Sequence, residues 1–431
     1  MSEKLRIQQI LDAKGMEPGA LVEVISSEGH TVRGILMPHH EFSQEDIVTI
    51  KLGTGYNIGI RPGDADSVIL ISKPEPRTKL GREIPTDSSK KTVSIISTGG
   101  TIASYVDYRT GAVHPAISAE ELVFSVPELL EICNIKAEVL CSVLSENMRA
   151  ENWKQLAEMV AKHLNEGSMG CIIPHGTDTM GFTAAALSFS LSNLTGPVIL
   201  VGSQRSSDRP SSDATINLLS AARLCIESDL AEVVVLMHAT VDDAASAVHR
   251  GTRVRKNHSS RRDAFQSVNE PPLGFVDDQK IRLEREHTSR SSEKVQADAE
   301  FDEEVVLIQF HPGMSVRRFE AYTEGAHGVV IAGTGLGHVS QDIISCIRDL
   351  TDRKVPVCIT TQCIWGATNL NVYSTGRDMI AAGAIPLGDM LSETAFVKLS
   401  WILGHTRELD KIRQLMQSNE RHEISERRCL Q

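Results

Sequence analysis

The sequence predicts an α/β protein, with a two-lobe α/β core preceded by a small N-terminal β-barrel. From residue 91 onward, buried-type strands alternate with helices, a pattern typical of a mostly parallel sheet covered on both faces. Before that point, five short β-rich runs are separated by turn residues, which favours a small barrel. At ~100–200 residues per domain, a length of 431 residues accommodates two or three domains.

Composition excludes several classes of protein. The 44 Lys and Arg against 56 Asp and Glu give a net charge of −12, and aromatic residues make up only 4%. Both values argue against a primary nucleic-acid binder, because phosphate affinity comes mainly from cations and single-strand binding from aromatic stacking. No apolar run approaches the ~20 residues that span a bilayer, and the N-terminus lacks the apolar region of a secretory signal.

The number and spacing of the cysteines indicate whether the chain is adapted to a reducing or an oxidising compartment. Eight cysteines are spread over the chain without a C-x-x-C pair. This density is too low for a disulfide scaffold, so buried, reduced thiols and a cytoplasmic location are expected.

The first 90 residues divide into a barrel and a linker. Residues 1–15 are predicted to form a short amphipathic helix with Ile7, Ile10 and Leu11 on one face. We assign residues 1–75 to the barrel domain and the charged, proline-containing residues 76–90 to a linker. The predicted strands are Leu21–Ile25, Thr31–Met37, Ile47–Leu52, Tyr56–Ile60 and Ser67–Ile71.

An N-terminal α/β domain is predicted over residues 91–285. Helices are expected at 151–164, 179–193 and 213–227. The predicted strands are Thr92–Ser97, Ala137–Leu144, Cys171–Pro174, Pro197–Gly202 and Glu232–His238. The polar stretch 242–300 interrupts the alternation.

A C-terminal α/β domain is predicted over residues 300–431. Its expected helices are 340–350 and 392–403, and its last ~25 residues are predicted to form a solvated, charged terminal helix or tail. The predicted strands are Glu304–Phe310, His327–Ala332 and Pro356–Thr360.

The first candidate site is the segment SIISTGGTIAS, residues 94–104. Glycines at the end of a buried strand allow a tight turn and close approach of the backbone to a ligand. Thr98 and Thr101 are then expected to project hydroxyl groups into the crevice above the sheet. The alternative is a structural turn in which a threonine caps a helix.

A second strand ends in a similar turn, His175-Gly176-Thr177-Asp178-Thr179. In a functional site, Thr177 and Asp178 would face the same crevice as Thr101. The alternative is that Asp178 or Thr179 is the N-cap of the following helix.

The third candidate is the basic run 250–262, which contains Lys256. A hydroxyl needs a nearby base to become a nucleophile, and a lysine aligned by a carboxylate such as Asp178 can supply one. The alternative is a solvated face or a phosphate-binding patch. Ser145 and Glu146, just past a strand end, offer a hydroxyl and a carboxylate for a small polar ligand.

Two other motifs carry less weight. The glycine run 333–337 has its third glycine one position early for a dinucleotide fingerprint. His311 and His338 lack further ligands at fixed spacing, so structural roles are expected rather than metal binding.

Taken together, residues 91–405 resemble the bacterial-type L-asparaginase family, through TGGTIA (98–103), HGTDTM (175–180), SENM (145–148) and the lysine-bearing segment 253–275. The resemblance implies an asparaginase-like two-lobe α/β core and hydrolysis of a carboxamide, with Thr101 as nucleophile and Tyr108 as its activator. It implies that Ser145 and Glu146 bind the substrate's α-carboxylate and α-amino groups. The implied catalytic residues are Thr101, Thr177, Asp178, Lys256 and Tyr108. The implied substrate-binding residues are Ser145, Glu146, Gly100 and Gly176.

The barrel, the linker and residues 376–404 resemble the archaeal family of tRNA-dependent amidotransferases. This resemblance implies that ammonia from glutamine or asparagine passes to a partner, the amidotransferase E subunit, which amidates Glu-tRNA(Gln). It also implies a homodimer core within a heterotetramer, and tRNA held mainly by the partner. ATP and Mg²⁺ would serve the complex, while this chain would need no cofactor for ammonia release. A free-standing asparaginase or glutaminase and an inactive binding scaffold remain the alternatives.

Overall fold

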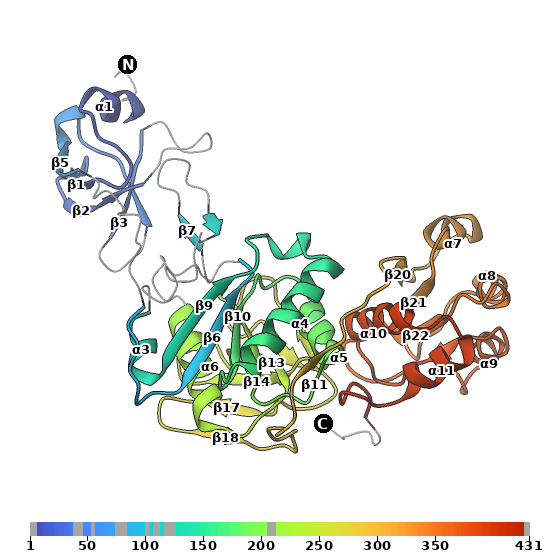
Figure 1. Ribbon diagram of the computed structural model, residues 1–431. Helices are drawn as coiled ribbons and strands as arrows, with labels where there is room; N and C mark the ends of the chain where they lie inside the picture. Colours follow the sequence, from blue (N-terminus) through green and yellow to red (C-terminus); the bar gives the residue numbers. More distant parts are fainter. Residues whose placement is uncertain are drawn as a thin grey trace.

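The structure is a computed structural model that describes residues 7–37, 46–52, 57–73, 84–99, 104–106, 113–115, 126–204 and 213–425. Figure 1 shows a small N-terminal part (blue), a central lobe built on a large sheet, and a C-terminal lobe (orange to red). The fold is therefore of the predicted α/β class, with a small β domain at its N-terminus.

The N-terminal part is one five-stranded antiparallel sheet with strand order β4-β3-β2-β1-β5. The short helix α1 (Ile7–Ala13) packs against it, burying Ile7 and Leu11 as the amphipathic pattern predicts. An isolated bridge between Ser26 and Pro62 joins the ends of two strands. The strands, which confirm the predicted β-rich runs, are β1 (Leu21–Ile25), β2 (Thr31–Leu36), β3 (Val48–Lys51), β4 (Asn57–Ile60) and β5 (Val68–Ser72). A single turn, η1 (Ala65–Ser67), precedes β5.

The central lobe contains an eight-stranded sheet with order β18-β17-β14-β13-β12-β10-β6-β9. From β13 to β9 all neighbours are parallel, and β14, β17 and β18 extend the sheet with antiparallel pairing. The parallel strands are β6 (Thr92–Ser97), β9 (Asn134–Val139), β10 (Cys171–Pro174), β12 (Val198–Val201) and β13 (Val233–His238). The antiparallel strands are β14 (Ser246–Arg250), β17 (Gly274–Val276) and β18 (Ile281–Leu283).

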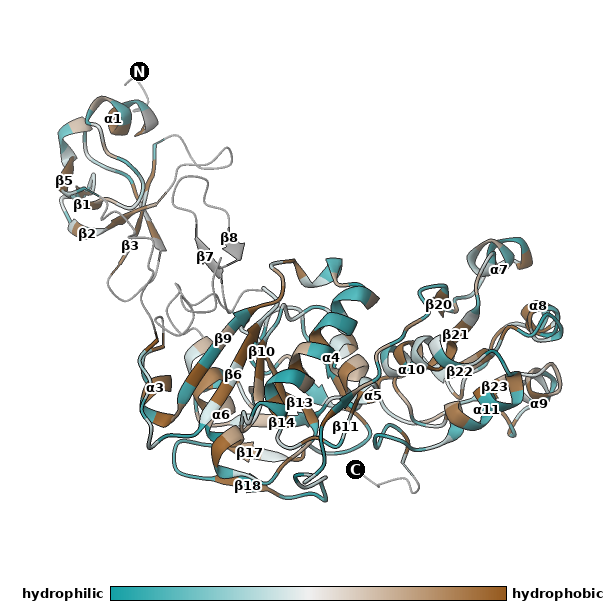
Figure 2. Ribbon diagram, in the orientation of Figure 1, coloured by the Kyte–Doolittle hydropathy of each residue, from teal (hydrophilic) through white to brown (hydrophobic). Residues whose placement is uncertain are grey.

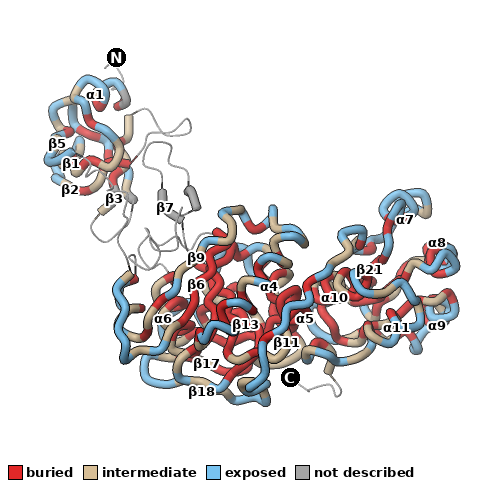
Figure 3. Tube along the Cα trace, in the orientation of Figure 1, coloured by how far each residue is buried: buried red, intermediate tan, exposed pale blue. Residues whose placement is uncertain are grey.

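Helices cover both faces of this sheet, because successive side chains of a strand point to opposite faces. Ile172 of β10 packs with α3 (Leu129–Ile132) and α6 (Ala214–Glu227). Its neighbours Cys171 and Ile173 pack with α4 (Ala150–Asn165) and α5 (Met180–Ser190) on the other face. The central strands are accordingly hydrophobic in Figure 2 and buried in Figure 3.

One prediction for this lobe was wrong in detail. The predicted strand Ala137–Leu144 is β9, which starts at Asn134 and ends at Val139, because its register follows β6 from Thr92 to Ser97. The stretch 242–300, which the structure describes throughout, interrupts the strand–helix alternation as predicted, since it contains no helix but the antiparallel strands above and three short ones. These short strands are β15 (Val254–Lys256), β16 (Phe265–Ser267) and β19 (Gln296–Ala297), the last paired with β11 (Leu191–Ser192). Two further strands pair with each other, β7 (Ser104–Val106) and β8 (Val113–Pro115).

The C-terminal lobe is a four-stranded parallel sheet, β20-β21-β22-β23, with helices on both faces. The strands are β20 (Val305–Gln309), β21 (Gly328–Gly333), β22 (Val357–Thr361) and β23 (Ile385–Pro386). The helices are α7 (Val316–Thr323), α8 (Gln341–Asp352), α9 (Ser374–Ala381), α10 (Ser392–His405) and α11 (Leu409–Gln417). Helices α7 and α9 have no counterpart in the sequence prediction.

The two lobes meet through α5 and α10, which lie side by side. Val397 packs in one cluster with Trp153 and Phe189, and the rings of Phe182 and Phe396 meet edge to face at 6.0 Å. This apolar contact fixes the position of the C-terminal lobe next to the turn that starts α5.

The C-terminal segment forms the predicted terminal helix, α11, but it is not fully solvated as its charge predicts. Ile412 and Met416 of α11 are fully buried against the sheet, and Glu423 beyond the helix is 0% exposed. The glutamate is buried because it forms an ion pair with Lys398 of α10, at 2.5 Å. The described end of the chain therefore belongs to the core.

All seven cysteines of the described part are free thiols, as predicted. Five are buried, whereas Cys141 is partly exposed and Cys363 exposed. Within the described residues, no helix has both the length and the hydropathy to cross a membrane.

Candidate active site

The candidate site lies where three neighbouring parallel strands end. β9, β6 and β10 are adjacent in the sheet, so their carboxyl ends lie at one edge. The turns after them carry the Ser145 segment, the Thr98-Gly99 turn and the His175–Thr179 turn, respectively. Ligands of open α/β sheets bind at this edge. The topology thus brings together the segments that the sequence singled out.

Two glycines let these turns come into close contact. Gly99 has φ +101°, a region that L-residues rarely adopt, and a Cβ there would lie 2.8 Å from the carbonyl oxygen of Val143. A Cβ on Gly176 would lie 2.7 Å from the Cβ of Ser145. Side chains at either position would push the Ser145 segment away from the other two turns.

Thr98 does not face the crevice, contrary to the sequence prediction. Its hydroxyl donates a hydrogen bond to the carbonyl oxygen of Pro174 at 3.0 Å, and the residue is 2% exposed. The hydroxyl satisfies a backbone group between the ends of β6 and β10, so Thr98 is a structural residue. Gly100, Thr101 and Tyr108 lie outside the described residues, and their predicted roles stay predictions.

Thr177, Asp178 and Lys256 come together although the lysine is 78 and 79 residues away in sequence. The Lys256 ammonium donates to the Thr177 hydroxyl at 2.8 Å and to the Asp178 carboxylate at 2.9 Å. Strand β15 holds the lysine through its antiparallel pairing with β16. Thr177 is 6% exposed and the lysine side chain 12%, while that of Asp178 is 71% exposed. One face of this cluster is therefore open.

The alternatives for these residues can now be judged. Thr179 is the N-cap of α5 by position, yet its side chain makes no capping bond and donates instead to the carbonyl oxygen of Ser145 at 2.6 Å. Asp178 accepts from Lys256 rather than capping the helix. The alternative is therefore confirmed for the position of the N-cap, Thr179, but neither side chain caps the helix with a hydrogen bond.

The solvated-face alternative holds for residues 257–261 of the basic run, which are exposed. A phosphate patch is not favoured, because each of the six cations of the run has an acidic partner. The ion pairs are Arg250 with Glu232 and Glu270, Arg253 with Asp389, Arg255 with Glu393, Lys256 with Asp178, Arg261 with Asp263 and Arg262 with Asp243.

A buried histidine supports the Thr177 turn from below. His175 is 0% exposed and lies within hydrogen-bond distance of the Gly176 carbonyl oxygen, at 2.7 Å, and of the Thr183 hydroxyl, at 2.9 Å. Trp153 donates its indole N–H to the same hydroxyl at 3.0 Å. This chain of hydrogen bonds assigns the proton to Nδ1, which donates to Gly176, and leaves Nε2 to accept from Thr183. Neutral His175 therefore satisfies every partner.

Burial lowers the pKa of His175 to about 4, although its bond to Gly176 acts in the opposite direction. Burial likewise lowers the pKa of His249, which contacts the Ser267 hydroxyl, to about 4. An unfolded histidine titrates near 6.5. The unfolded state therefore takes up protons first as the pH falls.

We predict that the free energy of unfolding is highest above pH 6.5 and declines as the pH falls toward 4. Each of the two histidines should lower the free energy of unfolding by about 2 kcal/mol as the pH falls from above 6.5 to 5. Urea unfolding from pH 8 to 5 measures this decline, and the free energy of unfolding at pH 8 is the reference value for each variant. His249→Asn should remove about half of the decline. An equal pH slope in this variant and in the wild type would contradict the assignment.

Ser145 and Glu146 occupy the single turn η3 (Ser145–Asn147) beside the Thr177 turn. Ser145 is 4% exposed, whereas Glu146 is exposed. The predicted roles of both residues in substrate binding stay predictions. Residues 334 and 338, in and after the glycine run, form a bridge that closes a tight turn.

Sequence reasoning missed the residues that hold the site together. Thr183 and Trp153 were assigned only to helices and Thr179 only to a turn or helix cap, yet they connect the Thr177 turn to Ser145 and α4. Thr179 belongs to the HGTDT segment, and only proximity to that segment pointed to Thr183. No local signal identifies Trp153, because its contact depends on how α4 and α5 pack.

Family models match three parts of the chain. Residues 92–289 match "Asparaginase, N-terminal" and residues 304–416 match "Glutaminase/Asparaginase C-terminal domain". Solved structures agree: the thermostable L-asparaginase from Thermococcus kodakarensis covers 78% of this chain and 99% of its own, at 32% identity and TM-score 0.71. L-asparaginase I from Vibrio cholerae has TM-score 0.68 at 27% identity, with coverage of 78% and 99%. The fold and the family models thus place the core of the chain in the asparaginase class.

The N-terminal part indicates which family within the asparaginase class the chain belongs to. Residues 16–71 match "GatD N-terminal domain". The D subunit of glutamyl-tRNA(Gln) amidotransferase from Pyrococcus furiosus is 48% identical over 98% of both chains. The Saccharolobus islandicus protein of the same name is 46% identical, over 99% of this chain and 97% of its own. The chain belongs to the family of glutamyl-tRNA(Gln) amidotransferase D subunits. It is thus an amidotransferase subunit with an asparaginase-type core, as the resemblance implied.

Proposed function

We propose that this chain releases ammonia from glutamine, or from asparagine, for a partner that amidates Glu-tRNA(Gln) to Gln-tRNA(Gln) with ATP. The observation that carries the proposal is the contact of the Lys256 ammonium with both Thr177 and Asp178. A hydroxyl, a carboxylate and a lysine within hydrogen-bond distance form a unit that can move a proton.

In the proposed reaction, the Thr101 oxygen attacks the carboxamide carbon of the substrate, and Tyr108 activates it. The tetrahedral intermediate carries an oxyanion, which backbone N–H groups of the Gly100 and Gly176 turns stabilise. The C–N bond breaks and ammonia leaves with a proton delivered through Thr177 and Lys256. Water then cleaves the acyl-enzyme and releases glutamate or aspartate.

In the proposed assembly, the ATP-dependent amidation takes place on a different subunit. Two copies of this chain and two E subunits form a heterotetramer in the cytoplasm, and the E subunits bind ATP, Mg²⁺ and most of the tRNA surface. This chain needs no cofactor for ammonia release. The net charge of −12 supports this division, because a chain with this excess of acidic groups is a poor tRNA binder.

The nucleophile is tested by Thr101→Val in the complete complex with ATP and Glu-tRNA(Gln). Glutamine-dependent ammonia release is expected to fall by at least about 10³-fold, since valine has the same shape but no hydroxyl. Thr101→Ser is the matched control and should retain measurable turnover. Intact ammonia release in the valine variant would assign the nucleophile to another residue.

A free-standing asparaginase is the second candidate, favoured by the similarity to the asparaginases from T. kodakarensis and V. cholerae. The two candidates differ in their dependence on partners. The isolated chain should release little ammonia from glutamine or asparagine, and turnover should rise when the E subunit, ATP and Glu-tRNA(Gln) are added. High turnover by the isolated chain, unaffected by these additions, would favour the asparaginase.

A further inference from the structure

Residues 418–425, which we name the C-terminal strap, follow α11 and return to the central lobe. The strap is anchored in the C-terminal lobe by Lys398, whose ammonium donates to the Ser418 carbonyl oxygen at 2.6 Å and to Glu423 at 2.5 Å. Lys398 and Glu423 are both 0% exposed. The strap is thus a fixed part of the structure rather than a loose end.

The far side of the strap contacts the segment that precedes Lys256. Arg253 donates from Nε to the His422 carbonyl oxygen at 2.7 Å and from Nη2 to the Ser425 hydroxyl at 2.9 Å. Thr252 donates its hydroxyl to the Arg421 carbonyl oxygen at 2.8 Å. Three hydrogen bonds therefore join the strap to two residues that lie three and four positions before Lys256.

The C-terminal lobe holds the same segment from another side. Arg253, which is 1% exposed, forms an ion pair with Asp389 at 3.1 Å. Arg255 pairs with Glu393 at 3.1 Å, and Thr394 donates to the carbonyl oxygen of residue 252 at 2.8 Å. The short strand that carries Lys256 is therefore held by its pairing with β16 in its own lobe, and the residues just before it are held by groups from the other lobe.

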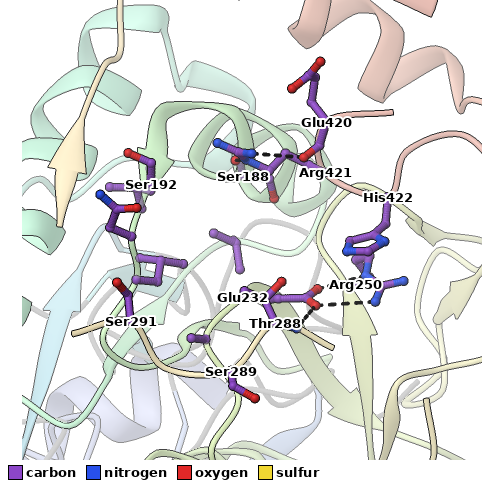
Figure 4. A pocket seen from close by; sticks show the side chains of 15 residues that line it. Ser188, Ser192, Glu232, Arg250, Thr288, Ser289, Ser291, Glu420, Arg421 and His422 are labelled. Carbon is purple, nitrogen blue, oxygen red and sulfur yellow. Dashed lines mark hydrogen bonds and ion pairs between the residues drawn. The ribbon is translucent and has the colours of Figure 1, made fainter. Parts of the chain in front are cut away.

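Figure 4 shows the strap residues Glu420, Arg421 and His422 at the edge of a cavity. The cavity, of about 280 Å³, is lined by residues that include Ser188, Glu232, Arg250 and Glu420 to His422. Arg421 donates a hydrogen bond to the carbonyl oxygen of Ser188, and Arg250 forms an ion pair with Glu232 at the cavity wall. On this side polar contacts hold the strap, so its position depends on few side chains.

We infer that the C-terminal strap positions Lys256 through Arg253, which makes Arg253 a positioning residue for the Thr177–Asp178–Lys256 cluster. The inference rests on the proposed function of that cluster. Displacement of a reacting group by about 1 Å costs up to ~10²-fold in rate. The strap contacts lie within four residues of Lys256, so their loss is expected to act on turnover rather than on substrate binding.

The test compares Arg253→Lys and Ser425→Ala in the complex with the E subunit, ATP and Glu-tRNA(Gln). Lysine can still pair with Asp389 but cannot reach His422 and Ser425 together, because it lacks the guanidinium fork. We expect kcat for glutamine hydrolysis to fall about 10- to 100-fold in Arg253→Lys, with KM unchanged. Ser425→Ala should lower kcat less, and the double variant should resemble Arg253→Lys alone, since both changes remove the same contact.

Arg290→Lys is the matched control. Arg290 also donates to several carbonyl oxygens, among them those of Met169, Thr195 and Ser228, but it does not contact residues 252–256. Its replacement should lower thermal stability without a selective loss of kcat. Equal kcat values for Arg253→Lys and the wild type, or equal losses in Arg253→Lys and Arg290→Lys, would overturn the inference.

A second readout does not depend on turnover. The rate of reductive methylation of Lys256, followed by mass spectrometry, should rise several-fold in Arg253→Lys and stay unchanged in Arg290→Lys. Should Arg253→Lys fail to fold, Ser425→Ala and Thr252→Val carry the same test. A wild-type complex without glutamine hydrolysis would refute the proposed function, whereas an unchanged Lys256 methylation rate in folded strap variants would refute the positioning role.

Discussion

Replacing Lys256 by methionine is expected to reduce glutamine hydrolysis by about 10²- to 10⁴-fold while the protein stays folded. The side chain keeps its length but loses the ammonium that donates to Thr177 and Asp178. Asp178 can tolerate this loss because its side chain is 71% exposed and water can solvate it. Ammonia release in the complex and the thermal midpoint are the two measurements.

Two further variants distinguish proton transfer by Lys256 from a purely electrostatic role. Lys256→Arg keeps the positive charge but does not give up its proton, so equal inactivity of both variants would assign proton transfer to Lys256. Partial activity of the arginine variant would assign it a purely electrostatic role. Lys136→Met, which removes a surface ion pair with Glu166, is the matched control and should leave turnover unchanged. Wild-type kinetics in Lys256→Met would place the lysine outside the catalytic machinery.

The largest expected effect on stability comes from Lys398→Met. The substitution would leave Glu423 as an unpaired charge at a position that is 0% exposed. Removing one member of a buried ion pair lowers the free energy of unfolding by about 3–5 kcal/mol. Replacing both members by uncharged residues often changes it little. We therefore expect a large loss of unfolding free energy in Lys398→Met and a substantial recovery in the double variant with Glu423→Gln.

Urea unfolding at pH 7 measures these differences, and acid provides an independent check. Burial acts to raise the pKa of Glu423, but the charge and hydrogen bond of Lys398 outweigh it and lower the pKa. The stability from Glu423 is thus present above its unfolded pKa near 4.5 and is lost as the pH falls below that value. Equal stabilities of Lys398→Met and the double variant would contradict the expectation that the unpaired charge of Glu423 causes the loss.

The elements predicted most accurately from the sequence are those whose local pattern and tertiary role agree. β1, β6 and β10 have the predicted bounds, because each is a compact apolar or alternating run bounded by turn residues. Strand β9 was shifted because its ends are set by pairing with β6, which a local pattern does not contain. The antiparallel strands β14 to β18 were missed because their sequences are short or rich in polar residues, although β14 is buried throughout.

In the candidate site, too, features set by the local sequence were predicted and features set by distant partners were not. Gly/Thr turns at strand ends predicted that Thr177 and Asp178 would lie in one crevice, and a single lysine within an arginine-rich run pointed to Lys256. The direction of the Thr98 hydroxyl and the burial of the C-terminal strap were not predictable, because both depend on partners from other strands or from the other lobe. Charge alone suggested solvent for the strap, whereas Lys398 compensates the buried Glu423.

The C-terminal strap also relates the site to the order of protein synthesis. A chain is synthesised from its N-terminus, so Thr177, Asp178 and Lys256 emerge from the ribosome long before residues 418–425. The bonds from Arg253 to His422 and Ser425 can therefore form only after the strap has been synthesised. A nascent or prematurely terminated chain carries all three side chains of the cluster without this support. If the strap positions Lys256 as proposed, such a chain is expected to hydrolyse glutamine less efficiently than the full-length chain.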